Sequence, residues 1–374
     1  MSQHDHTHHH HDAPAADVET RPPKQEQEPA SSDIVEVAPG ILRTQLPISM
    51  PGLGHVNCYV MEDERGIAIM DPGLPGEESW SALVDRLERA GYSVDDVHTA
   101  VVTHSHPDHF GGAIRLRAET DADVLTHESF RLAWGPAELD EDEDSSNLDL
   151  NTAEGRDEAI ERFFERRNPW GGKRESPPPE FIQRFREARR HGGTTSMTPE
   201  PTIAVVDQQT VKLARREWIA LHTPGHTYDH LCLYDPEHGV VFTGDHVLPS
   251  ITPHISGLTP QADPLAEFFE SLRRMTALGD VSIALPAHGH PFADIAGRAD
   301  HIILHHEERL DTLRAAGQQL PHGTVNDYMK VLFRERSWGD MAESETYAHL
   351  EHLRELGEMR RDDESGLARY TPVG

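Results

Sequence analysis

The stretch Thr103-His104-Ser105-His106-Pro107-Asp108-His109-Phe110-Gly111-Gly112 decides the fold prediction for this chain. It follows an apolar run at residues 100–102, which is typical of a short buried strand. Three imidazoles and one carboxylate fall close together, before a helix that we predict over residues 113–119. A loop between a strand and a helix can aim several side chains at one point in space. This geometry is what a metal site requires.

Further along the chain, three short motifs each place a histidine or an aspartate at the end of a predicted strand. They are Pro224-Gly225-His226, Gly244-Asp245 and Ala287-His288. Ligands at strand ends, with Gly or Pro giving backbone clearance, suit a site on the edge of a sandwich of two sheets. His55, at the start of another predicted strand, is a weaker neighbour of this site.

Other polar side chains near these motifs have competing interpretations. We expect His230 to form hydrogen bonds within the site, as residues behind metal ligands commonly do. His246 and His254 line the substrate pocket or pack in a loop, and Tyr228 donates a hydrogen bond to the substrate or lies on the surface. On a helix predicted over 295–316, a solvated face is expected for His301, His305 and His306.

Composition limits the classes of function. The chain has 374 residues, with 34 Lys and Arg against 65 Asp and Glu, a net charge of -31. Such a negative field disfavours general binding to nucleic acid or to an anionic membrane. No apolar run approaches the roughly 18–20 residues of a membrane span, and no apolar signal segment is present, so we expect a cytoplasmic protein.

The cysteine content adds a constraint on the metal site. Cys58 and Cys232 are the only cysteines, and each lies in an apolar, strand-like stretch. Buried, reduced thiols are expected rather than a disulfide. A zinc site held by cysteines is therefore not available.

The order of predicted elements indicates a layered α/β domain with additions. Residues 1–33, rich in His, Pro, Glu and Gln, are predicted to be a disordered tail. A catalytic domain is predicted over 34–317, with an insertion at 127–200 that we interpret as a helical cap over the substrate pocket. Residues 318–374 are predicted to form a small appended unit of two helices and a hairpin.

Taken together, the His-x-His-x-Asp-His motif, Pro-Gly-His, Gly-Asp and the final His resemble the pattern of the metallo-β-lactamase-fold hydrolases, over roughly residues 34–316. The resemblance implies an αββα sandwich with a dinuclear metal centre on its edge. The end of the chain is similar to a winged helix. The alternative for this unit is a helical tail that packs in a homodimer or closes the pocket.

The resemblance also implies a role for each matching residue. Two zinc ions per chain are expected, although iron or manganese would also fit these ligands. A hydroxide shared by the two metals would attack the substrate carbonyl, and Asp108 would orient it and pass its proton to the leaving group. The first metal would be held by His104, His106 and His226, the second by Asp108, His109 and His288, and Asp245 would bridge both.

The bridging residue bears on the branch of the family. True β-lactamases commonly have a cysteine where this chain has Asp245. The set with a bridging aspartate looks like that of glyoxalase II, other thioester hydrolases, lactonases and several nucleases. We therefore expect hydrolysis of a small thioester or ester, of the acyl-CoA or glutathione type. The alternatives are an endoribonuclease or phosphodiesterase with the same centre, which the charge disfavours, and a mononuclear-iron persulfide dioxygenase.

Overall fold

The computed structural model describes residues 24–50, 52–131, 167–172, 198–364 and 366–373, and the single residues 152, 155, 158, 179 and 183. The predicted cap at 127–200 and the first part of the predicted tail lie largely outside the described residues.

Residues 24–33 correct the prediction that residues 1–33 form a disordered tail. They include a 3₁₀ turn, η1 (Gln25–Gln27), and the buried Glu26 carboxylate, which accepts hydrogen bonds from the Ser250 and Ile251 backbone N–H groups at 2.8 and 3.0 Å. The packed chain therefore begins before residue 34.

Two mixed sheets form the centre of the molecule. The first sheet contains, in spatial order, β1 (Val35–Ala38), β2 (Ile41–Met50), β3 (Leu53–Asp63), β4 (Gly66–Met70), β5 (Val97–Val101), β6 (Asp123–His127) and β7 (Ile203–Val205). Its pairs are antiparallel from β1 to β4 and parallel from β4 to β7. The second sheet contains β12 (Ile283–Pro286), β11 (Val240–Gly244), β10 (Leu231–Asp235), β9 (Arg216–His222) and β8 (Thr210–Leu213). Only its β11–β12 pair is parallel.

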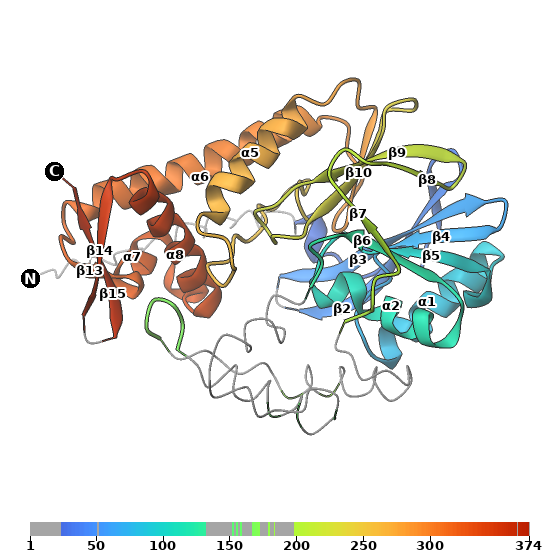
Figure 1. Ribbon diagram of the computed structural model, residues 1–374, viewed down its shortest axis with the longest axis horizontal. Helices are drawn as coiled ribbons and strands as arrows, with labels where there is room; N and C mark the ends of the chain where they lie inside the picture. The colour runs from blue at the N-terminus through green and yellow to red at the C-terminus, as the bar shows by residue number, and fades with distance from the viewer. Residues whose placement is uncertain are drawn as a thin grey trace, which may run out of the picture.

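The apolar clusters show how the layers stack. One cluster joins the facing sides of the two sheets, with Tyr59 and Val101 from the first sheet and Trp218 and Phe242 from the second. A second cluster packs helices α1 (Glu77–Ala90) and α2 (Pro107–Glu119) on the outer face of the first sheet. Since alternate side chains of a strand point to opposite faces, each sheet buries both faces. The predicted metallo-β-lactamase type of fold, two mixed sheets with helices, is confirmed (Figure 1).

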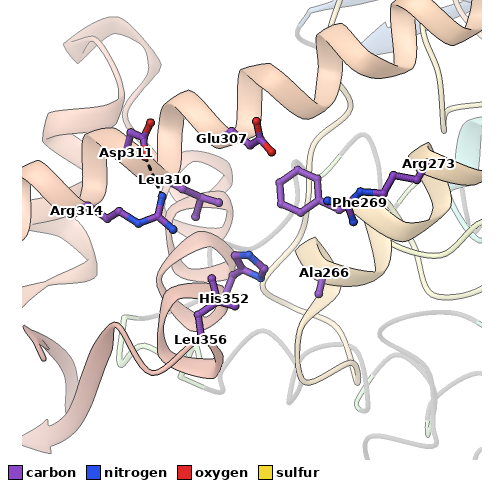
Figure 2. Close-up of a pocket in the computed structure, with 9 residues that line it drawn as sticks. All are labelled: Ala266, Phe269, Arg273, Glu307, Leu310, Asp311, Arg314, His352 and Leu356. Atoms are coloured by element: carbon purple, nitrogen blue, oxygen red, sulfur yellow. Dashed lines mark hydrogen bonds and ion pairs between the residues drawn. The ribbon is translucent and has the colours of Figure 1, made fainter. Parts of the chain in front are cut away.

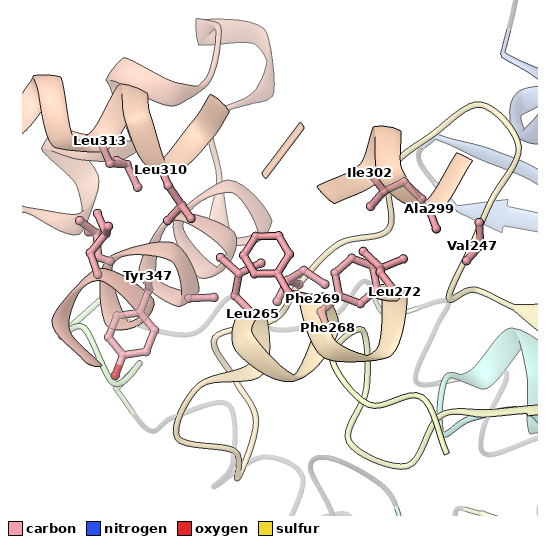
Figure 3. Close-up of a cluster of buried hydrophobic side chains, with 14 of the residues drawn as sticks. Val247, Leu265, Phe268, Phe269, Leu272, Ala299, Ile302, Leu310, Leu313 and Tyr347 are labelled. Atoms are coloured by element: carbon pink, nitrogen blue, oxygen red, sulfur yellow. The ribbon is translucent and has the colours of Figure 1, made fainter. Parts of the chain in front are cut away.

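The outer layer on the second sheet continues into the C-terminal unit. It consists of α5 (Pro264–Thr276) and the long helix α6 (Ile295–Gly317), which runs from the sheets into that unit (Figure 1). One apolar cluster includes Phe268 and Leu272 of α5, Ile302 and Leu310 of α6, and Tyr347 of the C-terminal unit (Figure 3). The C-terminal unit therefore shares a core with the catalytic layers.

The C-terminal unit has the predicted hairpin and a strand that the sequence analysis missed. Its elements are β13 (Gly323–Thr324), α7 (Val325–Leu332), α8 (Asp340–Glu355), β14 (Met359–Glu364) and β15 (Leu367–Pro372), and the strands form a sheet in the order β13-β15-β14. Thr324 and Asp327 form a capping box that begins α7. The small C-terminal sheet is thus present, and its description as a winged helix stays a prediction.

Two predictions from composition can be compared with this fold. Cys58 and Cys232 are both buried free thiols, as expected. Burial raises the pKa of the Cys232 thiol to about 12, so it stays protonated. Among the described residues, no helix combines the length and the apolar character that crossing a membrane would require.

Helix α2 begins earlier than the sequence predicted. It starts at Pro107, so Asp108 and His109 lie in its first turn instead of in a loop. Proline suits the first helical position because its fixed backbone angle matches the helix. We had interpreted Gly111 and Gly112 as a lead into the helix, but they lie inside it, where a Cβ atom would collide with the backbone of Pro75 and Pro72. The glycines are therefore required by close packing.

This packing leads to a prediction for Gly112→Ala. At an exposed position inside a helix, replacing Gly by Ala usually increases the free energy of unfolding by up to about 1 kcal/mol. Here the added methyl group would meet the Pro72 carbonyl oxygen, so we expect a loss of about 1–3 kcal/mol in the free energy of unfolding, measured by denaturant titration. Gly279→Ala is the matched control, because the nearest atom to its Cβ would be the Tyr234 hydroxyl at 3.7 Å. A stabilised Gly112→Ala protein would contradict the prediction.

Candidate metal centre

The seven predicted ligands come together on one edge of the two sheets. They form two adjacent groups, in each of which the potential ligand atoms lie within 4.8 Å of one another: His104, His106, His226 and Asp245, and Asp108, His109 and His288. Each residue lies near the end of a strand or at the start of α2. His104 and His106 follow β5, His226 lies between β9 and β10, Asp245 directly follows β11, and His288 lies just beyond β12. The residues that lie together are those that the family resemblance implied as ligands.

In the first group, three imidazole nitrogens converge. His106 Nδ1 lies 2.9 Å from His104 Nε2 and 3.1 Å from His226 Nε2. Asp245 Oδ2 is 3.6 Å from His226 Nε2 and 4.0 Å from His104 Nε2. Three nitrogens and one carboxylate oxygen form a donor set that suits zinc and several other transition metals.

In the second group, the Asp108 carboxylate faces two imidazoles. Its Oδ2 atom lies 3.4 Å from His109 Nε2 and 3.5 Å from His288 Nε2. Asp245 reaches the same nitrogens, at 3.7 Å from His109 Nε2 and, through Oδ1, at 3.2 Å from His288 Nε2. Asp245 thus contacts potential ligands of both groups.

The hydrogen bonds on the outer side of each ring fix which nitrogen faces the centre. His109 Nδ1 donates to the Asp71 carboxylate at 2.9 Å, His226 Nδ1 to the His254 carbonyl at 2.7 Å, and His288 Nδ1 to the His55 carbonyl at 2.6 Å. In the neutral form of each ring that binds a metal, Nδ1 would keep the proton and Nε2 would present a lone pair toward the carboxylates. His55 therefore contributes through its carbonyl group and not as a ligand.

Whether metal ions fit can be tested on the atoms that face the centre. His109 Nε2, His288 Nε2 and Asp245 Oδ1 are buried and form no hydrogen bond within the described part of the chain. A buried polar atom without a hydrogen-bond partner is costly, and a cation bound between these nitrogens and carboxylate oxygens would satisfy all three atoms at once. The seven residues therefore fit a dinuclear cation site.

The charges of the two groups differ when no metal is bound. Burial, followed by the nearby His226, lowers the pKa of His106 to about 3, and burial also lowers that of His104. Burial acts the same way on His109, but Asp108, Asp245 and Asp71 outweigh it and raise the pKa of His109 well above its usual range. The first group thus offers neutral imidazoles, whereas the second must lose a proton when it takes up a cation.

Asp108 itself is held in its ionised form. Its burial would raise the pKa, but His109 and His288 more than compensate and lower it to about 2. The carboxylate therefore accepts hydrogen bonds at neutral pH and is a weak proton donor.

Two buried carboxylates were missing from the predicted site. Asp71 accepts hydrogen bonds from the Thr103 backbone N–H, the Thr103 hydroxyl and His109 Nδ1, each at 2.9 Å. Its backbone has a φ of 53°, which is uncommon for a residue other than glycine and often marks a functional position. Asp229 accepts from the Ser105 hydroxyl at 3.1 Å, and burial raises its pKa to about 7. The available sequence signal is an aspartate at the end of a strand, in Asp71-Pro72-Gly73, but the same residues are typical of a simple turn.

The role of Asp71 can be tested with Asp71→Asn, which keeps a side chain that tolerates positive φ. We expect a 10- to 100-fold loss of metal affinity, on the order seen when an outer carboxylate is removed, because the amide cannot replace the charge behind His109. Asp235→Asn is a matched control, since Asp235 is equally buried but pairs with Arg216. Metal affinity measured by competition with a chelator should fall only in Asp71→Asn. Equal losses in both variants would mean that Asp71 is merely structural.

The neighbouring residues with open interpretations are now placed. His230 forms hydrogen bonds inside the site, as predicted: its Nε2 accepts from the Asp245 backbone N–H at 3.1 Å and its Nδ1 lies 2.8 Å from the Thr223 hydroxyl. His246 is fully buried and packs against Phe268, so loop packing is correct for it. Tyr228 is neither on the surface nor open to substrate, because it is buried and its hydroxyl donates to the Arg131 carbonyl at 2.6 Å.

The prediction that three histidines of α6 lie on a solvated face is wrong for His306. His301 is exposed and His305 is half-buried, but His306 is completely buried. Its ring faces His349 of α8, with centroids 5.1 Å apart. Helix α8 covers this position, and its docking could not be seen in the sequence of α6 alone.

A pocket elsewhere on the molecule does not coincide with the metal centre. It has a volume of about 450 Å³ and opens between α5, α6 and α8, as Figure 2 shows. Charged and apolar side chains line it, among them Phe269, Arg273, Glu307 and His352, and none of the seven predicted ligands does. The chemistry is therefore assigned to the sheet edge and not to this pocket.

Solved structures of other proteins share this fold. A metallo-beta-lactamase family protein from Thermus thermophilus superimposes with a TM-score of 0.71 and is 28% identical, covering 90% of this chain and 100% of its own. A beta-lactamase domain protein from Burkholderia ambifaria superimposes with a TM-score of 0.69 at 24% identity, covering 93% of this chain and 97% of its own, and supports the fold alone.

Curated relatives match shorter parts of this chain than the two solved structures do. The lactamase-like protein adaB of Aspergillus niger is 26% identical over 265 residues, which are 71% of this chain and 59% of that protein. The lactamase-like protein aptB of Emericella nidulans is 30% identical over 140 residues, 35% of this chain and 43% of that protein. This chain thus spans less than two thirds of the length of either relative.

Residues 51–288, more than half of the chain, match the family described as the metallo-beta-lactamase superfamily. With the His/Asp cluster at its sheet edge, the chain belongs to the metallo-beta-lactamase superfamily.

Proposed function

We propose that this protein is a dinuclear metal-dependent hydrolase of thioesters or related esters. The observation that carries the proposal is the position of Asp245. Its two oxygens reach His226 and His109 at 3.6 and 3.7 Å and His288 at 3.2 Å, so one carboxylate serves both groups of ligands. A single carboxylate shared in this way suits two cations held side by side.

Different residues of the chain would bind the cations and orient the attacking water. His104, His106 and His226 would hold one cation and Asp108, His109 and His288 the other, with Asp245 shared. Bound there, divalent metal ions would activate water at neutral pH and polarise the substrate carbonyl. Asp108, ionised beside His109 and His288, would accept a hydrogen bond from the attacking water and orient it.

The low pKa of Asp108 limits which leaving groups the site can expel, because some of them need a proton. A carboxyl group with a pKa of about 2 is a weak acid catalyst near pH 7, because it is rarely protonated. An amine leaving group needs a proton, whereas a thiol with a pKa of about 8.5 can leave as the thiolate. Asp108 would then pass the proton taken from water to the thiolate or to solvent. This argument favours thioesters over amides, including β-lactams.

Ribonuclease activity is the second candidate, and the charges of the C-terminal unit argue against it. A surface that follows a phosphate backbone needs unpaired Arg or Lys side chains. On this unit Arg361 pairs with Asp363 at 2.9 Å, Arg354 with Glu351 at 2.9 Å and Arg360 with Asp362 at 3.2 Å. These three cations are already neutralised by carboxylates.

The test is turnover of the zinc-loaded full-length protein on a panel of CoA and glutathione thioesters. Single-stranded RNA and a chromogenic β-lactam serve as competing substrates, and oxygen uptake with glutathione persulfide tests the dioxygenase alternative. We expect thioester hydrolysis that is lost in Asp245→Ala. RNA cleavage, β-lactam hydrolysis or oxygen uptake without thioesterase activity would overturn the proposal.

A further inference from the structure

A second cluster of possible metal ligands lies outside the metal centre, where α6 meets α8. It contains His306 of α6 and Glu345 and His349 of α8, whose potential ligand atoms all lie within 4.8 Å of one another. His306 and His349 are completely buried. We call these three residues the α6–α8 cluster. Nothing in the proposed hydrolytic reaction requires it.

The cluster combines one helix face with a residue from a second helix. Glu345 and His349 are four residues apart on α8, so their side chains lie on the same face. His306 approaches from α6, with its Nδ1 atom 3.0 Å from His349 Nε2. This separation resembles the 2.9 and 3.1 Å between ligand nitrogens in the metal centre. Two nitrogens bound to one zinc ion at about 2.0–2.1 Å would lie roughly 3.3 Å apart, a small adjustment from this geometry.

The orientation of His349 is that of a metal ligand. Its Nδ1 donates to the Glu345 carbonyl at 2.6 Å, so the lone pair is on Nε2, which faces His306. Histidine ligands commonly donate their other N–H group to a carbonyl in this way. His226 and His288 of the metal centre are held by the same kind of bond.

The remaining nitrogen of His306 has no partner. One proton can be shared between His306 Nδ1 and His349 Nε2, but His306 Nε2 is buried and forms no hydrogen bond with any residue that the structure describes. An ion held between His306 Nδ1 and His349 Nε2 would require the proton of His306 to lie on Nε2, which would leave the lone pair on Nδ1, the nitrogen that faces His349. The rings of Phe268 and Phe269 pack against His306 in T-shaped contacts, with centroids 5.7 and 6.2 Å away, so the surroundings of the ring on the α5 side are apolar.

The charge state of the cluster suits a divalent transition metal. Burial lowers the pKa of His306 well below its usual value and that of His349 to about 4, so both imidazoles are neutral at pH 7. Burial would raise the pKa of Glu345, but His254 and Arg309 outweigh it and keep the carboxylate ionised. Two neutral imidazoles and one carboxylate form a donor set that zinc accepts.

The neighbours of Glu345 define which oxygen is free and suggest a fourth ligand. Arg309 binds Oε1 at 2.8 Å, so a cation would bind Oε2, whose one hydrogen-bond contact in the described part of the chain is with His254. His254 Nδ1 lies 3.4 Å from Oε2 on the partly exposed side of the cluster. The His254 carbonyl accepts the hydrogen bond of His226, so the same residue contacts both clusters.

We propose that the α6–α8 cluster is a third metal site, which binds one divalent transition metal, with zinc the best match, through His306, Glu345 and His349. The ion would join α6 to α8 and so fix the C-terminal unit on the catalytic domain. Through His254 it would also steady the segment that orients His226. The site does not depend on which substrate the metal centre hydrolyses.

The direct test is a crystal structure of the full-length wild-type protein grown with zinc, with anomalous scattering measured at the zinc edge. We expect a peak within bonding distance of His306, Glu345 and His349, separate from the peaks at the metal centre. Peaks at the metal centre with none in the α6–α8 cluster would overturn the proposal. Since this experiment uses no variant, it does not depend on the folding of a mutant.

Metal content in solution provides a second test. After dialysis against zinc, we expect His349→Gln to hold about one equivalent fewer than His301→Gln, an exposed histidine on helix α6. The His-rich residues 4–11 are the same in both variants, so their zinc cancels in the difference. Equal zinc content in the two folded variants would overturn the proposal. Because neither measurement uses turnover, a failure of the thioesterase proposal would leave both results interpretable.

Discussion

Asp245→Ala should lower turnover by roughly 1,000-fold or more and should remove metal from the sheet-edge centre at the same time. The reason is that Asp245 contacts imidazoles of both ligand groups, at 3.2 to 4.0 Å, so its loss weakens both. Metal ions contribute several kcal/mol to this type of catalysis, and about 4 kcal/mol corresponds to a factor near 1,000. Turnover and metal content would be measured on the same preparation.

The control for this variant is Asp300→Ala, which removes an exposed carboxylate of α6. It should retain full metal content and full turnover. Circular dichroism should report a folded chain for both variants, because the sheets and helices do not depend on Asp245. Full activity in Asp245→Ala would mean that the assignment of the metal centre is wrong.

Removal of metal should abolish activity and lower the melting temperature by roughly 10 °C. A ligand present at about 1,000 times its dissociation constant stabilises the folded state by about 4 kcal/mol, which corresponds to this shift for a domain of this size. Without the cations, His109 Nε2, His288 Nε2 and Asp245 Oδ1 stay buried without hydrogen-bond partners in the described chain. Differential scanning fluorimetry before and after dialysis against a chelator measures the effect.

Two comparisons make this result specific. Zinc added back after removal of the chelator should restore both activity and melting temperature. In Asp245→Ala the chelator should cause a clearly smaller shift, since most of the stabilisation has already been lost. A melting temperature that does not respond to the chelator in the wild-type protein would contradict the assignment of a metal centre.

Much of the metal centre was predictable because its ligands are placed by local sequence. His104 and His106 follow a strand directly, and Asp245 and His288 do so on two further strands. The end of β5 in the first sheet and the ends of β11 and β12 in the second lie at the same edge of the sandwich, so short motifs with Gly or Pro already suggested that residues far apart in the chain come together there. The buried free thiols of Cys58 and Cys232 followed from the same local reasoning.

The errors share a physical cause, which is packing between distant segments. Gly111 and Gly112 were predicted to precede the helix, yet they lie inside α2 and are needed because α2 lies directly against Pro75 and Pro72. Asp71 looked like a turn residue, yet its carboxylate holds His109, which is 38 positions later. In both cases the decisive neighbour is remote in sequence, and periodicity records only which residues of an element share a face.

The motifs of the sequence by themselves carried the resemblance to the metallo-beta-lactamase superfamily, and that resemblance implied the sandwich of two sheets and the residues at its edge. Only the tertiary structure decided which carboxylates support the ligands and that His306 lies inside the protein. His306 is exposed or buried according to whether α8 docks on α6, and that contact joins residues 43 positions apart. The free energy of such docking comes from apolar surface buried between the two helices, which neither helix reveals alone.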